Sequence, residues 1–269
     1  MTPIRFRNLV LAHYKEHGRH DLSWRKTKDA YRILVSEVML QQTQVERVLP
    51  FYKAFLKEFP DVRVLASAPL ANVLIRWQGL GYNRRAKMLH EAAKTVVKDY
   101  AGKMPNTVEA LEKLPGIGHY TARAVAAFAY NEDVILIETN LRTVVTHHFF
   151  PDEEKVSDKE ILLILEKAFR KGTSREWYSA LMDYGAFLKR SGVRINAKSK
   201  TYTKQSAFAG SGREARGVIL RALSKEAKTE RFLASLLGVE RYEQVAAQLQ
   251  KLLKEGLIEK KRTKYQLAS

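Results

Sequence analysis

Residues 114–130 read LPGIGHYTARAVAAFAY, and this stretch decides the fold that we expect. Pro115 and the pair Gly116 and Gly118 predict a tight turn that leads into a helix of small residues. The first turn of such a helix leaves backbone N–H groups unpaired, so it can offer several donors to one phosphate without reading a base. Taken alone, a Gly-x-Gly before a helix fits an ordinary structural turn equally well. With a Leu-Pro step in front and small residues behind, the stretch predicts a helix-hairpin-helix motif.

Two carboxylates flank this hairpin in the sequence. After it, the apolar run VILI at 134–137 delivers Glu138 just before Asn140 and a new helix. An acid in that position is expected to accept backbone N–H bonds, which lower its pKa and keep it ionised. The alternative is an ordinary capping acid without a chemical role.

Before the hairpin, Glu37 lies among Leu34, Val35, Val38 and Met39 on a strongly apolar helix. If Glu37 faces inward, desolvation raises its pKa and keeps a proton available near neutral pH. An exposed glutamate on the polar stripe is the alternative. One carboxylate with a raised pKa and one with a lowered pKa would suit cleavage of a glycosidic bond through an oxocarbenium-like transition state.

Helical periodicity extends over residues 1–188, so we expect an all-α unit of many short helices. The expected helices lie around 4–17, 30–45, 48–58, 70–76, 85–99, 107–113, 120–130, 139–147, 158–170 and 175–188. Residues 189–206 have no convincing period and are expected to form a basic linker. Residues 207–269 predict a winged helix-turn-helix, with helices at 213–223, 228–237 and 241–254 and a hairpin that turns at Arg262-Thr263.

The charge is concentrated towards the end of the chain. In total, 47 Lys and Arg face 29 Asp and Glu, a net charge of +18. Residues 189–269 hold 19 Lys and Arg against 7 Asp and Glu, a net charge of +12. A solvated basic face would also give such a surplus, but its concentration favours nucleic acid as the partner.

Cysteine is absent from the sequence, which excludes disulfides, a thiolate nucleophile, thiolate-bound zinc and a Cys-ligated iron–sulfur cluster. The first residues do not form a secretory signal, and no apolar run approaches the roughly 18 residues that span a bilayer. We therefore expect a cytoplasmic, nucleoid-associated protein that has no membrane partner.

Four stretches resemble the helix-hairpin-helix DNA glycosylases, and most closely the MutY-type adenine glycosylases. They are LSWRKTKDAYRILVSEVMLQQTQV (22–45), APLANVLIRWQGLGYNRRAKMLHEAA (68–93), LPGIGHYTA (114–122) and ALMDYGA (180–186). The resemblance covers nearly all of residues 1–188 and implies a catalytic domain of two helical parts. A six-helix barrel part would take about 21–118, and the second part would combine 1–20 with 119–188.

The resemblance also implies catalytic roles. Glu37 matches the general acid, which would protonate the flipped adenine at N7. Glu138, with Asn140, would stabilise the cationic sugar. Tyr120 lies where bifunctional relatives carry a catalytic lysine, so a Schiff-base lyase step is not expected.

Other residues match positions that hold DNA in the family. Gln41, Gln42 and Tyr82 would wedge into the duplex beside the extruded base. The hairpin would anchor a phosphate, and a monovalent cation could bind there. The candidates at the hairpin are Gly116, Gly118, His119 and Thr121. Arg25 and Arg84 are candidates for phosphate or base contacts, with plain surface charge as the alternative.

The sequence departs from the family in three places. Glu138 replaces an aspartate, and the extra methylene moves the carboxylate oxygens by up to roughly 1.5 Å. The cysteines that should follow ALMDYGA are missing, so residues 187–206 must be held by packing and hydrogen bonds. A basic winged helix stands where the family has a Nudix-like domain that recognises 8-oxoguanine.

We therefore expect a monomeric, monofunctional DNA glycosylase of base excision repair without a metal or an iron–sulfur cluster. Its substrate would be adenine mispaired with guanine or 8-oxoguanine in double-stranded DNA. A thymine or uracil mismatch glycosylase and a non-catalytic lesion-binding protein are the alternatives.

Overall fold

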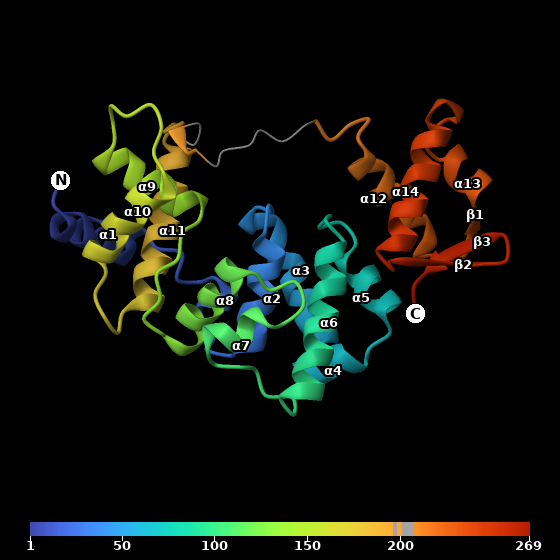
Figure 1. Ribbon diagram of the computed structural model, residues 1–269, viewed down its shortest axis with the longest axis horizontal. Helices are drawn as coiled ribbons and strands as arrows, with labels where there is room; N and C mark the ends of the chain where they lie inside the picture. Colours follow the sequence, from blue (N-terminus) through green and yellow to red (C-terminus); the bar gives the residue numbers. More distant parts are fainter. Residues whose placement is uncertain (196–197, 201–206) are drawn as a thin grey trace. The chain divides into compact units, whose positions relative to one another are not determined.

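The computed structural model describes residues 1–195, 198–200 and 207–269, which fold mainly into helices (Figure 1). The mainly helical fold predicted from the sequence is confirmed. Within these described ranges, no helix is both long and apolar enough to cross a membrane. The rest of the expected linker, residues 196–197 and 201–206, lies outside the described residues.

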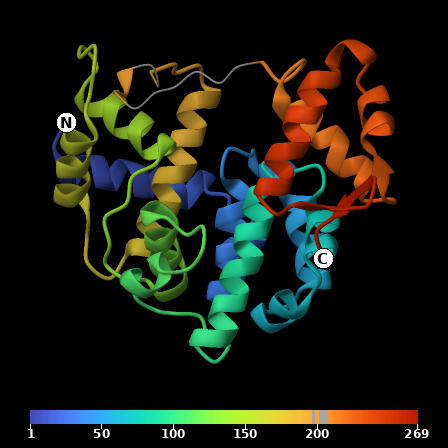
Figure 2. The same cartoon turned by 45° about the vertical axis from the view of Figure 1, so that its right-hand side comes forward.

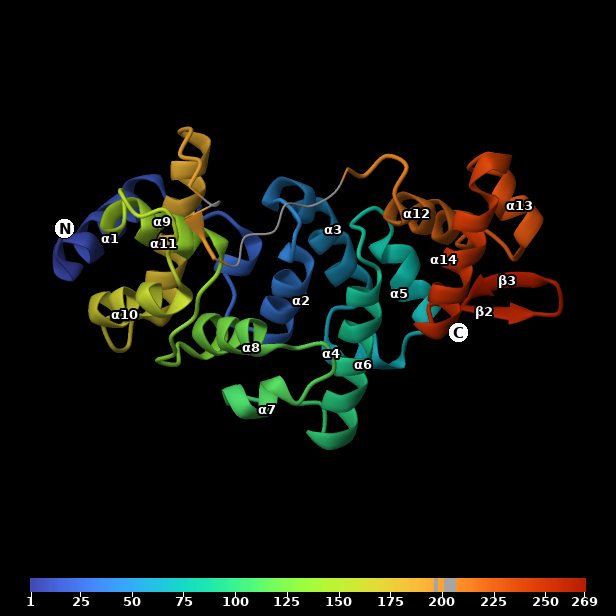
Figure 3. The ribbon, with the colours of Figure 1, turned by 45° about the horizontal axis from the view of Figure 1, so that its top comes forward.

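The chain forms two compact units. The first gathers residues 1–34, 106–112 and 118–204. In it, helix α11 packs against α9 and α1, and α1 also packs against α10 (Figures 1 and 3). The helices of this unit are α1 (Pro3–His17), η1 (Ser23–Arg25), α7 (Val108–Glu112), α8 (His119–Val125), the π-helical turn η2 (Ala126–Tyr130), α9 (Thr139–Phe149), α10 (Asp158–Ala168) and α11 (Ser174–Arg190).

A buried ion cluster attaches the segment of Arg19 and Arg25 to α11. The side chain of Asp183 on α11 is only 2% exposed. Its Oδ1 accepts hydrogen bonds from Arg19 Nη2 at 2.6 Å and from Arg25 Nη2 at 3.1 Å. Because a buried carboxylate needs such partners, the segment that carries Arg25 packs onto α11. Residues 21–34 group with the first unit, whereas the sequence analysis placed them in the six-helix part.

The second unit gathers residues 35–105, 113–117 and 205–269. Helix α2 (Ala30–Leu40) begins in the first unit and ends in this one, and α6 lies against α4 and α5 (Figure 2). Its other helices are α3 (Val45–Glu58), α4 (Val62–Ser67), α5 (Leu70–Trp77), α6 (Arg84–Asp99), α12 (Gly212–Leu223), α13 (Glu230–Ser235), η4 (Val239–Arg241) and α14 (Tyr242–Lys254). Helix α4 was not predicted, because six residues are too few to show a helical period.

The last part of the chain has the element order of a winged helix (Figure 3). Strand β1 (Lys228–Thr229) separates α12 from α13, and a hairpin of β2 (Ile258–Lys261) and β3 (Lys264–Leu267) follows α14. The three strands form an antiparallel sheet in the order β1-β3-β2. The three helices and the turn at Arg262-Thr263 agree with the sequence-based expectation. Strand β1 was not expected, since two residues carry no pattern.

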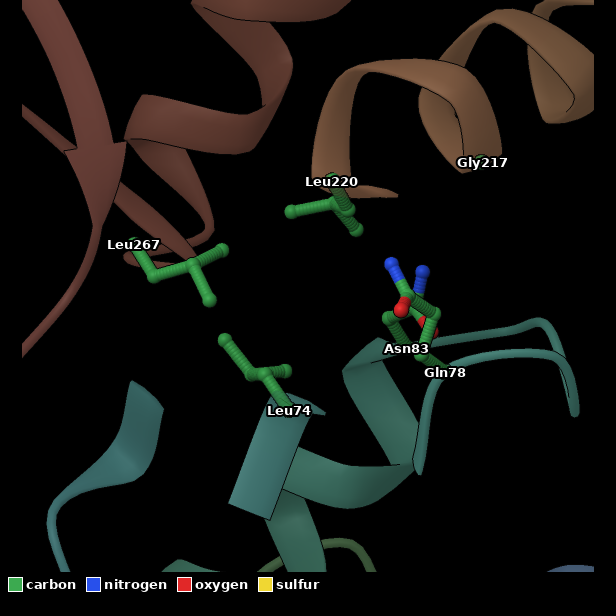
Figure 4. A pocket seen from close by; sticks show the side chains of 6 residues that line it. All are labelled: Leu74, Gln78, Asn83, Gly217, Leu220 and Leu267. Carbon is green, nitrogen blue, oxygen red and sulfur yellow. The ribbon is translucent and has the colours of Figure 1, made fainter. Parts of the chain in front are cut away.

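The winged helix packs inside the second unit and is not a separate body. Gln78 Nε2 donates to Ser224 Oγ at 3.2 Å, and Lys87 Nζ donates to the carbonyl oxygen of Glu255 at 2.6 Å. Figure 4 shows the apolar part of this contact, where side chains of α5, α12 and β3 point toward one another. The labelled residues are Leu74, Gln78, Asn83, Gly217, Leu220 and Leu267. Removing residues 207–269 would therefore expose Leu74 and the side of α5 to water.

The hairpin turn depends on one of its two glycines for stability. Gly116 has a φ of +74°, and a Cβ there would clash with Met88 on α6, whereas a Cβ at Gly118 meets nothing within 4 Å. We expect Gly116→Ala to lower the free energy of unfolding by about 1–3 kcal/mol, because it adds backbone strain and a steric clash. Gly118→Ala is the matched control and should stay close to the wild type in urea unfolding. Equal stabilities of the two variants would contradict this role of Gly116.

Candidate active site

Glu138 caps the N-terminus of α9 through its own side chain. Its Oε1 accepts hydrogen bonds from the backbone N–H groups of Asn140 at 2.7 Å and Leu141 at 3.1 Å. Its Oε2 accepts a longer bond, 3.3 Å, from the Nδ2 of Asn140. The extended backbone of Glu138, with φ −147° and ψ −178°, places the carboxylate over the first turn. The sequence-based prediction of a carboxylate at this helix end is confirmed.

The ionisation of Glu138 differs from the expectation. Burial raises the pKa of Glu138 above its usual value, although the hydrogen bonds from Asn140 and Leu141 and the charges of Lys189 and Arg142 oppose this shift. The expected lowering of the pKa is wrong in sign, because desolvation outweighs the stabilisation of the ionised form by the helix end. Burial therefore disfavours the ionised form of Glu138 in the folded protein.

Helix α11 contacts Asn140, the residue that bonds to the Glu138 carboxylate. Gly185 lies so close to α9 that a Cβ there would be 2.6 Å from both Cβ and O of Asn140. One turn further along α11, Lys189 Nζ donates to Asn140 Oδ1 at 2.8 Å. The expected linker therefore begins later than predicted, because Lys189 and Arg190 continue α11. No pattern in the sequence pointed to Lys189.

Glu37 lies on α2, in the part of that helix that belongs to the second unit. It is 7% exposed, so the inward orientation is correct and the exposed polar stripe is not. Its role as a general acid stays a prediction. Glu138 and Asn140, in the first unit, are the predicted catalytic residues that the structure brings into contact.

The guanidinium of Arg85 holds the two loops in which we predicted wedge residues. Its Nη1 donates to the carbonyl oxygens of Val38 at 2.9 Å and Gln41 at 2.5 Å, and its Nη2 donates to that of Gly81 at 3.2 Å. Arg85 thus bonds to carbonyls at the end of α2, which ends at Leu40. The expected continuation of this helix to residue 45 is wrong. Burial lowers the pKa of Arg85 to about 10. The sequence did not single out Arg85, which differs in no local pattern from Arg84.

Two of the three predicted wedge residues, Gln42 and Tyr82, have a left-handed backbone conformation. Gln42 has a φ of +54° and Tyr82 a φ of +48°, a region that non-glycine residues rarely adopt. Gln42 is exposed and Tyr82 is 38% exposed, while Gln41 is half-buried. Arg85 donates to the carbonyl oxygens of Gln41 and Gly81, and its guanidinium lies 5.4 Å from the centroid of the Tyr82 ring. Their expected insertion into DNA is untested.

The hairpin residues differ in accessibility. His119 begins α8, and its Nδ1 lies 2.8 Å from Glu112 Oε1 in an exposed pair. Thr121 is 3% exposed, so its side chain is too buried for a DNA contact and only its backbone N–H remains a candidate. Tyr120 is half-buried on the same helix.

Arg25 was a candidate for contacting DNA, and the structure corrects this. Its side chain is 10% exposed, and its guanidinium donates to Asp183 and to the carbonyl oxygen of Ser179. A guanidinium committed to a buried carboxylate is not available for phosphate. Arg84 is exposed and remains a candidate.

The residues of this chain do not fit an iron–sulfur cluster. The sequence contains no cysteine, and in the part of the chain that the structure describes, no three His, Asp or Glu side chains gather as metal ligands. The described part of segment 187–206 is held by backbone hydrogen bonds, as we expected. Val156 N donates to Lys198 O at 2.9 Å, and Lys200 N donates to Val156 O at 3.3 Å.

The chain is similar in sequence to known DNA repair proteins. The family model described as "HhH-GPD superfamily base excision DNA repair protein" matches residues 35–171. An adenine DNA glycosylase of Mycolicibacterium smegmatis is 42% identical over 65% of this chain and 61% of its own length. Adenine DNA glycosylases of Buchnera aphidicola subsp. Baizongia pistaciae (34%, 70% of this chain and 54% of the relative) and Homo sapiens (40%, 52% and 27%) are also similar.

Solved structures show the same fold. A thermostable thymine-DNA glycosylase superposes with a TM-score of 0.60 and 26% identity, over 68% of this chain and 86% of the other. A trapped endonuclease III–DNA intermediate gives a TM-score of 0.59 at 19% identity, over 70% and 87%. The chain spans only 54% to 61% of the length of the first three bacterial relatives that it matches.

The raised pKa of Glu138 predicts how its replacement affects stability. The folded state holds the proton of Glu138 more tightly than the unfolded chain does, so this group lowers stability as the pH rises from about 4.5 through its folded pKa. Glu138→Gln cannot ionise, and its stability relative to the wild type should therefore be greater at pH 7 than near pH 4.5. Urea unfolding at both values measures this, with the exposed Glu109→Gln as control. A relative stability that falls as the pH rises would contradict the raised pKa.

Proposed function

Because the chain belongs to the HhH-GPD superfamily of base excision DNA repair proteins, we propose that it is a monofunctional adenine DNA glycosylase. It hydrolyses the N-glycosidic bond of adenine mispaired with guanine or 8-oxoguanine in double-stranded DNA. The observation that carries this proposal is the carboxylate of Glu138, held at the start of α9 by Asn140 in a fold shared with DNA glycosylases. The names of the similar curated proteins support adenine as the base.

Glu37 is the proposed general acid. Protonation of adenine at N7 makes the base a better leaving group, and the same carboxylate then accepts a proton from the attacking water. A buried position on α2 suits this role, since it excludes bulk water from the proton transfer. Tyr120 does not supply an amine for a Schiff base, so the reaction ends at the abasic site.

Glu138 is the proposed electrostatic partner of the sugar cation. Positive charge develops on the sugar as the glycosidic bond breaks. Burial makes the ionised carboxylate unfavourable before the reaction, and the developing cation offsets that penalty in the transition state. The N–H groups of Asn140 and Leu141 hold the carboxylate in place meanwhile.

A thymine or uracil mismatch glycosylase is the second candidate. The structural similarity to a thymine-DNA glycosylase and the tyrosine at position 120 favour it. Those enzymes generally lack an acid at the position of Glu37, so this candidate function does not explain why the chain has one there. A non-catalytic lesion-binding protein would need neither carboxylate.

Single-turnover excision on duplexes with each mismatch tests the proposal. We expect adenine release opposite guanine or 8-oxoguanine, and a rate lower by about 10²–10⁴-fold in Glu37→Gln and in Glu138→Gln. Both variants should bind the duplex as tightly as the wild type, because neither replaces a phosphate contact. Release of thymine or uracil in place of adenine would support the second candidate, and binding without any excision would support the third.

The wing is proposed to contact phosphate. Arg262 and Lys264 are exposed at the hairpin of β2 and β3. Their replacement by alanine should make the dependence of log K on log[salt] less steep by about 0.9 for each phosphate contact that is lost. The excised base should stay the same.

The control for the wing variant replaces two exposed lysines elsewhere in the second unit, Lys57 on α3 and Lys98 on α6. The control should keep the wild-type salt slope. A changed base preference in the wing variant would instead indicate that the wing reads the opposite base.

A further inference from the structure

Lys189 is a cation beside Asn140 that the mechanism above leaves without a role. It lies in the last turn of α11, is half-buried, and donates from Nζ to Asn140 Oδ1 at 2.8 Å. Burial lowers the pKa of Lys189, and the charge of Glu138 opposes that shift. An ammonium group that is withdrawn from water needs compensation, and here this comes from one amide oxygen and a nearby carboxylate.

The contact determines which way the amide of Asn140 points. An ammonium group has only donors, so Asn140 must present Oδ1 to Lys189. The amide Nδ2 then faces the opposite direction, where it donates to Glu138 Oε2 at 3.3 Å. Lys189, Asn140 and Glu138 therefore form a polar chain, and a flipped amide would lose both of its contacts.

The charges around Glu138 come from two helices. On α9, the N–H groups of Asn140 and Leu141 bond to the carboxylate, and the charge of Arg142 also favours its ionised form. Arg142, however, already forms a two-bond ion pair with Asp158 of α10, at 2.8 and 2.7 Å. Its charge is thus largely compensated. On α11, the charge of Lys189 acts on Glu138.

We infer that Lys189 is a positioning residue for the proposed reaction: it orients Asn140 against Glu138 and supplies a positive charge that favours the ionised form of this carboxylate. The inference rests on the proposed function for its kinetic consequence. The effect of the Lys189 charge on Glu138 follows from the contacts of Lys189 with Asn140 and of Asn140 with Glu138, and does not depend on the proposed function. Packing alone would be satisfied by any side chain of similar length, whereas this role needs a positive charge at position 189.

The test compares Lys189→Met, which keeps the length and removes the charge, with Lys189→Arg, which keeps the charge. The matched control is Lys167→Met, which removes an exposed lysine from α10 in the same unit. The first readout is the carbon NMR titration of glutamate carboxyl groups in the full chain, with Glu138→Gln used to assign the resonance. The second readout is the pH profile of single-turnover adenine excision.

In Lys189→Met, we expect the titration of Glu138 and the acidic limb of the rate profile to move to higher pH. Excision at pH 7 should fall by about 10- to 100-fold, the effect of losing one hydrogen bond to a charged group. Lys189→Arg should restore most of the rate and the wild-type titration, and Lys167→Met should match the wild type in both.

Two results would overturn the inference. One is an unchanged titration of Glu138 in Lys189→Met. The other is an equal loss of rate in the Met and Arg variants, which would indicate packing. Failure of the proposed function is distinct from both: the wild type would then release no adenine, while the NMR titration, which needs no substrate, still reports the effect of Lys189.

Discussion

A charged group that folding buries must keep a partner, and both units of this protein are organised by that constraint. In the first unit, Asp183 on α11 binds Arg19 and Arg25, which attaches the segment before α2 to α11. In the second unit, Arg85 takes backbone carbonyls from the end of α2 and from the loop at Gly81. Each cluster joins segments that are far apart in the sequence, and each positions a loop or helix that the proposed chemistry needs.

Glu138 is the group for which this compensation is incomplete. It receives two backbone N–H bonds and the charges of neighbouring cations, and its pKa is still raised. A carboxylate held in this way is unfavourable for folding and useful for a reaction in which a cation forms beside it. The close packing of α9 on α11 at Gly185 and the contact of Asn140 with Lys189 maintain the geometry. Stability and the proposed activity therefore make opposite demands on this residue.

Turns and helix caps were predictable from the sequence, whereas the residues that each buried charged side chain contacts were not. The hairpin and the cap at Glu138 follow from turn chemistry and from the residues around them, whereas the sequence left the orientation of Glu37 open between inward and exposed. Arg25 and Arg85 look alike in sequence, since both are arginines in polar stretches. What distinguishes them from exposed Arg84 is burial against carbonyls or a carboxylate elsewhere in the chain. The sign of the pKa shift at Glu138 was missed for the same reason, because desolvation depends on what packs over the residue.

The sequence by itself determined the mainly helical fold, the helix-hairpin-helix turn, the winged-helix order after residue 207 and the absence of thiolate chemistry. These features depend on residue type and on spacing within a few turns, which local geometry converts into structure. Only the tertiary structure decided that the winged helix packs against α5, that Arg25 belongs to Asp183, and that Lys189 reaches Asn140. The physical reason is that burial and electrostatic partnership are properties of neighbours in space, and those neighbours are 49 to 158 positions apart in the chain.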